Sequence, residues 1–290
     1  MPDILRAILL MVLGSFFFML ADMFMKLSSQ TMSIGLVSMM LGGGMAVFFA
    51  VLMLRAGSPF FDRRYLHFAM AMRCVGEAVG VMGIVIALAF SPLATVTALM
   101  QSLPLVLTVM GAVFLKEPVG WRRILALVAG LVGVLIIIRP GMTGFDLFAT
   151  FTLLGVAGMA IRDFGTRIMP REISTAALSF YGSLTIVLMG MAMIVFSGDW
   201  RPPTGEGMRY IVGLVVVGSL GTLAVSTAMR LGDVSVISPF RYVRVVFGVG
   251  AGILVFGETV DLPILLGSAI VIGAGLYSWM RERKLTLKHD

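Results

Sequence analysis

The chain has 290 residues, of which 59% are hydrophobic and 13% are charged, and its mean hydropathy is +1.03. A water-soluble domain has about 45–50% apolar and about 25% charged residues, so a soluble globule of this length is excluded. A net charge of +7 can indicate a nucleic-acid partner. The basic residues lie in short segments between apolar runs instead of along one polar face, which argues against nucleic acid. The lipid bilayer is therefore the expected solvent.

Ten apolar segments are long enough to predict membrane-spanning helices, which need roughly 20 residues each. The first begins near Ile4 and has no small-x-small cleavage site, so we interpret it as an uncleaved helix instead of a signal peptide. Proline, glycine or charged residues separate the segments, with only Ser91-Pro92 between the third and the fourth. The predicted spans are residues 4–25, 34–54, 67–90, 92–115, 120–138, 145–168, 173–196, 208–230, 234–256 and 262–280.

The basic residues predict the orientation, because lysine and arginine favour the cytoplasmic side of short loops. With the N-terminus inside, four of the 22 basic residues fall outside and four lie within spans, which leaves 14 on the inner side. We therefore expect both termini to be cytoplasmic, in a multi-pass protein of a bacterial-type inner membrane. The outer four are Lys26, Arg139, Arg201 and Arg209, and the four within spans are Arg73, Arg162, Arg241 and Arg244.

An internal repeat appears when the chain is shifted by 141 positions. Asp22 then falls on Asp163, Gly57 on Gly198, and Glu117 on Glu258, and the helix boundaries superimpose. Each half carries five predicted spans, and an odd number forces the second half to enter the membrane from the opposite side. We therefore predict an all-α membrane protein of two inverted five-helix repeats, residues 1–141 and 142–290. That symmetry is typical of secondary transporters, with the substrate near mid-membrane.

Two segments resemble the end of an EamA repeat of the drug/metabolite transporter superfamily. The first is Glu117-Pro118-Val119-Gly120-Trp121, followed by Arg139-Pro140-Gly141, and the second is Gly257-Glu258-Thr259. The resemblance covers the whole chain and implies a ten-helix transporter that does not hydrolyse ATP. It does not identify the substrate, because members carry amino acids, vitamins, nucleoside-like metabolites and toxic compounds.

Ionisable residues inside spans are costly and are therefore functional candidates. Asp22 and Asp163 occur in both halves, each four positions before a basic residue, so they are candidates for gating or for solvated terminal ion pairs. Glu117 and Glu258 lie at helix ends, where we expect capping. Arg162 is adjacent to Asp163, so we expect the two side chains to point in different directions, with Arg162 near the inner mouth as a further candidate for gating.

Two further charged pairs occur in one half only. Arg73 and Glu77 are spaced i,i+4 and can pair. Arg73 is a candidate for substrate binding and Glu77 for proton coupling, and the alternative is a neutral structural pair. Arg241 and Arg244 share one helix face after Pro239. An arginine fork suits a carboxylate or phosphate, so we predict an anion-binding clamp. The alternative is that Glu77 or a carbonyl neutralises one arginine and the other reaches the cytoplasmic surface.

Polar residues of the fourth span complete the predicted substrate site. Thr97, Gln101, Pro104 and Thr108 follow helical spacing on one face, which indicates cavity lining or inter-helix hydrogen bonding. Tyr242 is the counterpart of Gln101 in the second half. Ser15, Phe16 and Tyr181 are weaker candidates. The spacings Gly76-x3-Gly80 and Gly248-x3-Gly252 predict close helix packing.

The composition gives no support for catalysis or a bound metal. Cys74 is the single cysteine, which excludes an intramolecular disulfide and a thiolate metal site, and His67 and His289 are too few for zinc. No familiar catalytic or nucleotide-binding motif is present. We predict a secondary transporter of a small organic metabolite, active as a monomer or homodimer without catalytic residues or cofactors. A membrane-embedded enzyme or a channel is the alternative.

Overall fold

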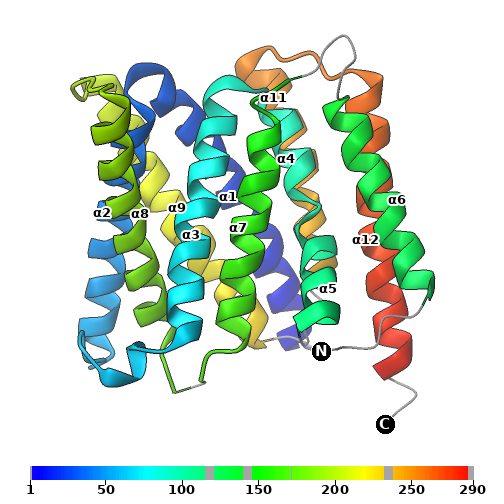
Figure 1. The fold of residues 1–290 in the computed structure, drawn as a ribbon, viewed down its shortest axis with the longest axis horizontal. Coiled ribbons are helices and arrows are strands. Elements are labelled where there is room, and N and C mark those ends of the chain that lie inside the picture. The colour runs from blue at the N-terminus through cyan, green and yellow to red at the C-terminus, as the bar shows by residue number, and fades with distance from the viewer. Residues whose placement is uncertain (1, 115–120, 140–145, 171, 232–237, 287–290) are drawn as a thin grey trace. The chain divides into compact units, whose positions relative to one another are not determined.

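A computed structural model describes residues 2–114, 121–139, 146–170, 172–231 and 238–286, which form helices joined by turns and short loops (Figure 1). A helix occupies each predicted span. Among the described residues, six helices are long and apolar enough to cross a membrane, with α4 and α5 counted together. Two further apolar helical segments, Ile124–Ile138 and Leu262–Tyr277, are shorter. The helices are α1 Pro2–Thr31, α2 Ile34–Arg55, α3 Phe68–Phe90, α4 Leu93–Met100, α5 Leu103–Phe114, α6 Trp121–Ile138, α7 Thr150–Arg167, α8 Thr175–Ser197, α9 Gly205–Leu231, α11 Val243–Phe256 and α12 Leu262–Thr286, with the 3-10 turns η1 Arg63–Tyr65 and η2 Ser238–Tyr242.

Helix boundaries recur along the chain with the offset found in the sequence. The helices α2 and α8 begin at Ile34 and Thr175, 141 positions apart, and α6 and α12 begin at Trp121 and Leu262 with the same separation. Gly57, the second residue after α2, and Gly198, the first residue after α8, have φ of 62° and 64°. Glycine adopts this left-handed conformation without the steric penalty of a Cβ atom. Equivalent positions of the two halves therefore adopt the same left-handed conformation, one residue later after α2 than after α8.

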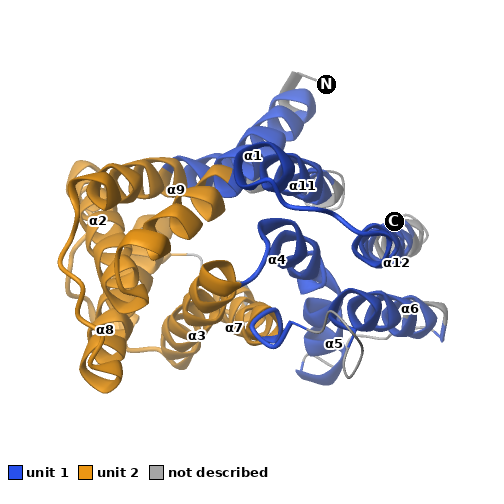
Figure 2. Ribbon diagram, turned by 90° about the horizontal axis from the view of Figure 1, so that it is seen from above, with its two compact units in different colours: residues 1–19, 91–150, 220–290 blue, residues 20–90, 151–219 orange. Residues whose placement is uncertain are grey.

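The chain folds into two compact units (Figure 2). Unit 1 contains residues 1–19, 91–150 and 220–290, and unit 2 contains residues 20–90 and 151–219. Each unit takes helices from both predicted halves. In unit 1, the start of α1 and the end of α12 lie at the same end, at the bottom of Figure 1.

Helices α2 and α8 pack against each other in unit 2 with their backbones in close contact at two glycines. A Cβ atom on Gly35 would lie 2.9 Å from the carbonyl oxygen of Gly190, and one on Gly42 would lie 2.7 Å from that of Ser183. Residue numbers rise along α2 as they fall along α8, so the two helices are antiparallel. Gly57 and Gly198 therefore lie at opposite ends of this pair.

A second close crossing in unit 2 joins α3 to α7. A Cβ atom on Gly76 would lie 2.6 Å from the carbonyl oxygen of Gly158, and one on Gly83 would lie 2.6 Å from that of Phe151. Gly80 packs against the backbone of Gly158 in the same way. This confirms the close packing predicted from Gly76-x3-Gly80. The crossing brings the charged side chains of α3 and α7 together.

Unit 1 is held by the antiparallel pair α6 and α12. A Cβ atom on Gly133 would lie 2.8 Å from the carbonyl oxygen of Gly267, and one on Gly267 would lie 2.6 Å from that of Gly133. Around them lies a buried apolar cluster that includes Val134, Ile137 and Val271. At the end of α6, Arg139 donates a hydrogen bond to Asp261, which lowers the pKa of that carboxyl below its usual value. The carboxylate therefore stays ionised at neutral pH.

Candidate functional site

The fourth span is interrupted where the predicted substrate residues lie. Helix α4 ends at Met100 and α5 begins at Leu103, and the amides of Gln101 and Ser102 donate to carbonyls three residues back. Pro104 has no N–H group and cannot continue the α-helical bonding to Met100. Thr97 and Thr108 therefore lie on either side of the interruption, and the single face predicted for them stays a prediction.

At the equivalent position in the second half, a 3-10 turn leads directly into an α-helix. The 3-10 turn η2 ends at Tyr242, the counterpart of Gln101, and α11 begins at Val243. Helix α11 packs antiparallel on α4 in unit 1, with Gly248 against Thr97 and Gly252 near Ala94. This confirms the close contact predicted from Gly248-x3-Gly252.

Arg244 lies at the start of α11, beside aromatic side chains of α1. The α4–α11 register places Arg244 level with Gln101. The Arg244 guanidinium is 5.4 Å from the centre of the Phe18 ring, within range of a cation–π interaction. Phe16 and Phe247 also meet edge to face, with ring centres 5.4 Å apart. Arg241 precedes this point in η2. Unit 1 thus places two predicted arginines where η2 leads into α11, with an aromatic ring beside Arg244.

The other predicted binding residues of unit 1 are buried. The Thr97 hydroxyl donates to the carbonyl of Leu93 at 2.8 Å, and the Gln101 amide donates to the carbonyl of Thr97 at 3.2 Å. Both side chains are thus bonded to their own helix. The Tyr242 hydroxyl packs against Gly275 and has no hydrogen-bond partner among the described residues. Ser15 is 3% exposed. Contact of these four residues with a substrate stays a prediction.

Glu258 caps the start of α4 from a distant part of the chain. Its carboxylate accepts hydrogen bonds from the amides of Leu93 at 2.7 Å and Ala94 at 3.1 Å. Free amides and the helix dipole at an N-terminus both favour a carboxylate there. The predicted capping role is therefore confirmed for Glu258, whereas Glu117 lies outside the described residues.

Unit 2 contains a cluster of four charged side chains, formed by Arg73 and Glu77 of α3 and Arg162 and Asp163 of α7. The predicted i,i+4 pair forms, with Arg73 Nη2 at 3.4 Å from Glu77 Oε2. Arg162 Nη1 lies 3.3 Å from Glu77 Oε1, so the two carboxylate oxygens face different arginines. The cluster contains two positive and two negative groups. Pairing of this kind is the usual way in which charges are accommodated away from water.

One prediction about this cluster is wrong. Arg162 and Asp163 do not point apart, because Arg162 Nε donates to Asp163 Oδ1 at 2.8 Å. The arginine side chain is long enough to fold back onto its neighbour, which the i,i+1 spacing alone does not reveal. Arg73 also donates to the Leu178 carbonyl of α8 at 3.2 Å and to Thr166 at 2.9 Å. Sequence reasoning missed both acceptors. The cluster therefore ties three helices together.

Asp22, the counterpart of Asp163, is 5% exposed in α1. Its predicted pairing with Lys26 and its role in gating stay predictions. The side chain of Arg167, the partner expected for Asp163, lies outside the described part of the structure.

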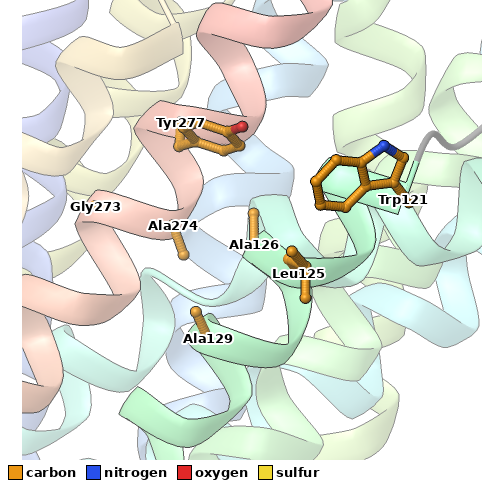
Figure 3. Close-up of a pocket in the computed structure, with 7 residues that line it drawn as sticks. All are labelled: Trp121, Leu125, Ala126, Ala129, Gly273, Ala274 and Tyr277. Atoms are coloured by element: carbon orange, nitrogen blue, oxygen red, sulfur yellow. The ribbon is translucent and has the colours of Figure 1, made fainter.

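An apolar pocket of about 400 Å³ lies between α6 and α12 in unit 1 (Figure 3). Trp121, Leu125 and Ala126 line it from α6, and Ala274 and Tyr277 line it from α12. None of its lining residues is charged, and none is a predicted site residue. Its chemistry fits an acyl chain better than a polar metabolite.

Comparisons with known proteins agree on the type of molecule. The model of the EamA-like transporter family matches residues 5–139 and again residues 147–279. An S-adenosylmethionine uptake transporter of Rickettsia felis is 26% identical, over 70% of this chain and 69% of that protein. A riboflavin transporter of Brucella anthropi is 28% identical, over 74% of this chain and 77% of that protein. A solved crystal structure with 18% identity has a TM-score of 0.60 over 97% of this chain and 99% of its own, and so has a similar fold.

Proposed function

This chain belongs to the EamA-like transporter family, and we propose that it carries a small organic metabolite with an anionic group by alternating access. It is a transporter and not an enzyme, and it is a multi-pass protein of the inner membrane with a small-molecule substrate. The proposal adds the charge of the substrate, the residues that bind it and the way the protein moves it. The proteins named for S-adenosylmethionine and riboflavin support an amino-acid-like or vitamin- or nucleoside-like solute.

The observation that carries the proposal is the pair of arginines where the 3-10 turn η2 leads into α11, which packs on α4 beside the interruption of the fourth span. Discontinuous helices in transporters present backbone groups and charged side chains to the substrate near mid-membrane. Arg241 and Arg244 lie where η2 gives way to α11, opposite the interruption between α4 and α5. An arginine inside a membrane span is functional by default, and its planar fork matches a carboxylate or phosphate. Arg244 and Arg241 would therefore hold the anionic group, with Gln101 at the interruption of the fourth span and Tyr242 at the start of α11.

The proposed movement is the exchange of conformation between two inverted five-helix halves. The recurrence of helix starts at an offset of 141 residues supports this repeat, as does the antiparallel packing of α2 on α8. Ten crossings with both termini in the cytoplasm agree with the distribution of basic residues. Two nearly equivalent halves can exchange conformations and so open one site to either side.

The cluster around Glu77 is our proposed coupling or gating element. Glu77 lies between Arg73 and Arg162, and the cluster joins α3, α7 and α8. A proton on Glu77 would leave two arginines beside the single charge of Asp163, which would weaken these links. Protonation could thus be coupled to separation of the three helices.

Arg244→Met tests the binding proposal. Purified protein is screened by thermal shift against compound pairs that differ in one anionic group, such as riboflavin and its 5′-phosphate, adenosine and its monophosphate, or phenylalanine and its amide. We expect the anionic member of one pair to bind better. The affinity of the Arg244→Met variant for that anionic compound should fall about 30-fold, because loss of one partner of a buried charge pair costs about 2 kcal/mol or more. Counterflow of the same compound in proteoliposomes should fall with it.

Arg201→Met is the matched control, because Arg201 is exposed and pairs with Asp199 outside the spans. It should bind and exchange the compound as the unmodified protein does. Equal binding of charged and neutral members of every pair, or full binding and counterflow in folded Arg244→Met, would contradict the anion clamp. A compound that enters without acceleration by internal unlabelled compound would indicate a channel.

A further inference from the structure

Side-chain hydrogen bonds and ring contacts order the loop between α2 and α3. The Tyr65 hydroxyl donates to the carbonyl of Pro59 at 2.9 Å, and the Tyr181 hydroxyl of α8 donates to the carbonyl of Phe60. The rings of Tyr65 and Tyr181 meet with centres 5.4 Å apart. These contacts fix the loop against α8 within unit 2.

A cavity of about 750 Å³ lies under this loop. Its rim carries Phe61, Leu66 and Phe68, which are 91%, 89% and 74% exposed. Its inner wall includes Met70, which is buried, and the partly buried Tyr181. Large apolar side chains this exposed, gathered around one cavity, indicate a surface that something else covers.

The polar side chains of the cavity favour a negative ligand. Arg63 and His67 both line it. His67 Nδ1 accepts a hydrogen bond from the Ala69 amide at 3.1 Å, so Nε2 is the nitrogen that can donate to a ligand. Asp62 also lines the cavity, but its carboxylate binds Arg64 through Nε at 2.8 Å.

The segment around the cavity is basic overall. Arg55, Arg63 and Arg64 lie close together in sequence, and the acidic groups near them are Asp62 and Glu172. A hydrogen bond from Arg64 lowers the pKa of Asp62, so that pair stays ionised and neutral overall. Arg55 and Arg63 are the remaining cations of the loop, against Glu172.

We propose that this cavity binds an anionic phospholipid, with its phosphate at Arg63 and His67 and an acyl chain along Phe61, Leu66 and Phe68. The loop joins the ends of two apolar helices, α2 and α3, and therefore lies at the level where headgroups meet acyl chains. Exposed aromatic side chains beside arginines are suited to that level. The basic loop matches the negative inner leaflet. This site is independent of the transported solute and of the arginines of unit 1.

Native mass spectrometry of the purified full chain in detergent tests the site, with dioleoylphosphatidylglycerol and dioleoylphosphatidylcholine as probes. We expect phosphatidylglycerol to be retained preferentially. Arg63→Gln should reduce its retention about fivefold, the factor expected for one interfacial arginine. Ala71→Trp, which places a large ring in the cavity wall, should reduce retention of both lipids.

Two controls separate this site from general lipid adhesion. Arg201→Gln removes an exposed arginine beyond the other end of α8, and Val47→Trp places a ring at a 67% exposed position on α2. Both should retain phosphatidylglycerol fully. Equal retention of the two lipids by the unmodified protein would overturn the proposal. So would full retention in both Arg63→Gln and Ala71→Trp, with thermal unfolding used to establish that each variant is folded.

Discussion

Replacing Glu77 with alanine is expected to destabilise the protein by about 3–5 kcal/mol, because removing one partner of a buried ion pair leaves its partner charge uncompensated. Glu77 is close to two arginines, at 3.4 Å from Arg73 and 3.3 Å from Arg162. Without it, Asp163 is the acidic side chain of the cluster that remains to balance them, among the residues that the structure describes. The free energy of unfolding can be measured in detergent by denaturant titration with fluorescence of the native tryptophans.

A charge-balanced double variant isolates the electrostatic part of this effect. Arg73→Leu with Glu77→Leu removes one positive and one negative group and leaves the Arg162–Asp163 pair. The second half of the chain has Leu214 and Gly218 at the equivalent positions. We expect the double variant to recover at least half of the lost stability, because neutral replacement of a whole buried pair is often tolerated. A double variant as unstable as Glu77→Ala would contradict the charge-balance account.

Gly158→Leu is expected to prevent α3 from packing on α7 and to abolish recovery of folded protein. A Cβ atom on Gly158 would lie 2.7 Å from the Cα atom of Gly80, and backbone atoms cannot rotate away as a side chain can. We expect this clash to destabilise the folded protein by more than about 4–5 kcal/mol, which is a large part of the free energy of unfolding of most proteins. Yield and monodispersity after detergent extraction measure the effect.

Gly43→Leu is the matched control for this substitution. Gly43 lies in α2 of the same unit, and a Cβ atom there would meet nothing within 4 Å. Its yield should equal that of the unmodified protein. Recovery of folded, monodisperse Gly158→Leu would show that the α3–α7 crossing does not need glycine.

The placement of the helices was largely predictable, because apolar length and turn residues mark a membrane span directly. Ser91-Pro92 illustrates this, since α3 ends at Phe90 and α4 begins at Leu93 as the turn predicted. The interruption at Gln101 and Ser102 was missed. Pro104 removes one hydrogen bond, but the same loss is often absorbed by a kink within a continuous helix. The packing of α11 on α4 therefore also contributes to the interruption of the helix.

The charged residues were identified from sequence, but their partners were only partly predicted. The Arg73–Glu77 pair follows from spacing within one helix. The contact of Arg162 with Glu77 depends on how α3 crosses α7, which a single sequence does not specify. That crossing is marked by small residues on both helices, Gly76, Gly80 and Gly83 on α3 and Gly155 and Gly158 on α7. The prediction of close packing rested on Gly76 and Gly80 alone. Phe18 beside Arg244 had no sequence signal of its own.

The central claim is that the two halves face opposite ways across the membrane, and the equivalent positions Ser58 and Asp199 test it most directly. Each follows the glycine that ends α2 or α8, 141 residues apart. Single cysteines are introduced by Ser58→Cys and Asp199→Cys in a Cys74→Ser background and labelled with a membrane-impermeant maleimide in intact cells. The account predicts that Asp199→Cys is labelled at once and Ser58→Cys only after permeabilisation. Labelling of both from the same side would contradict it.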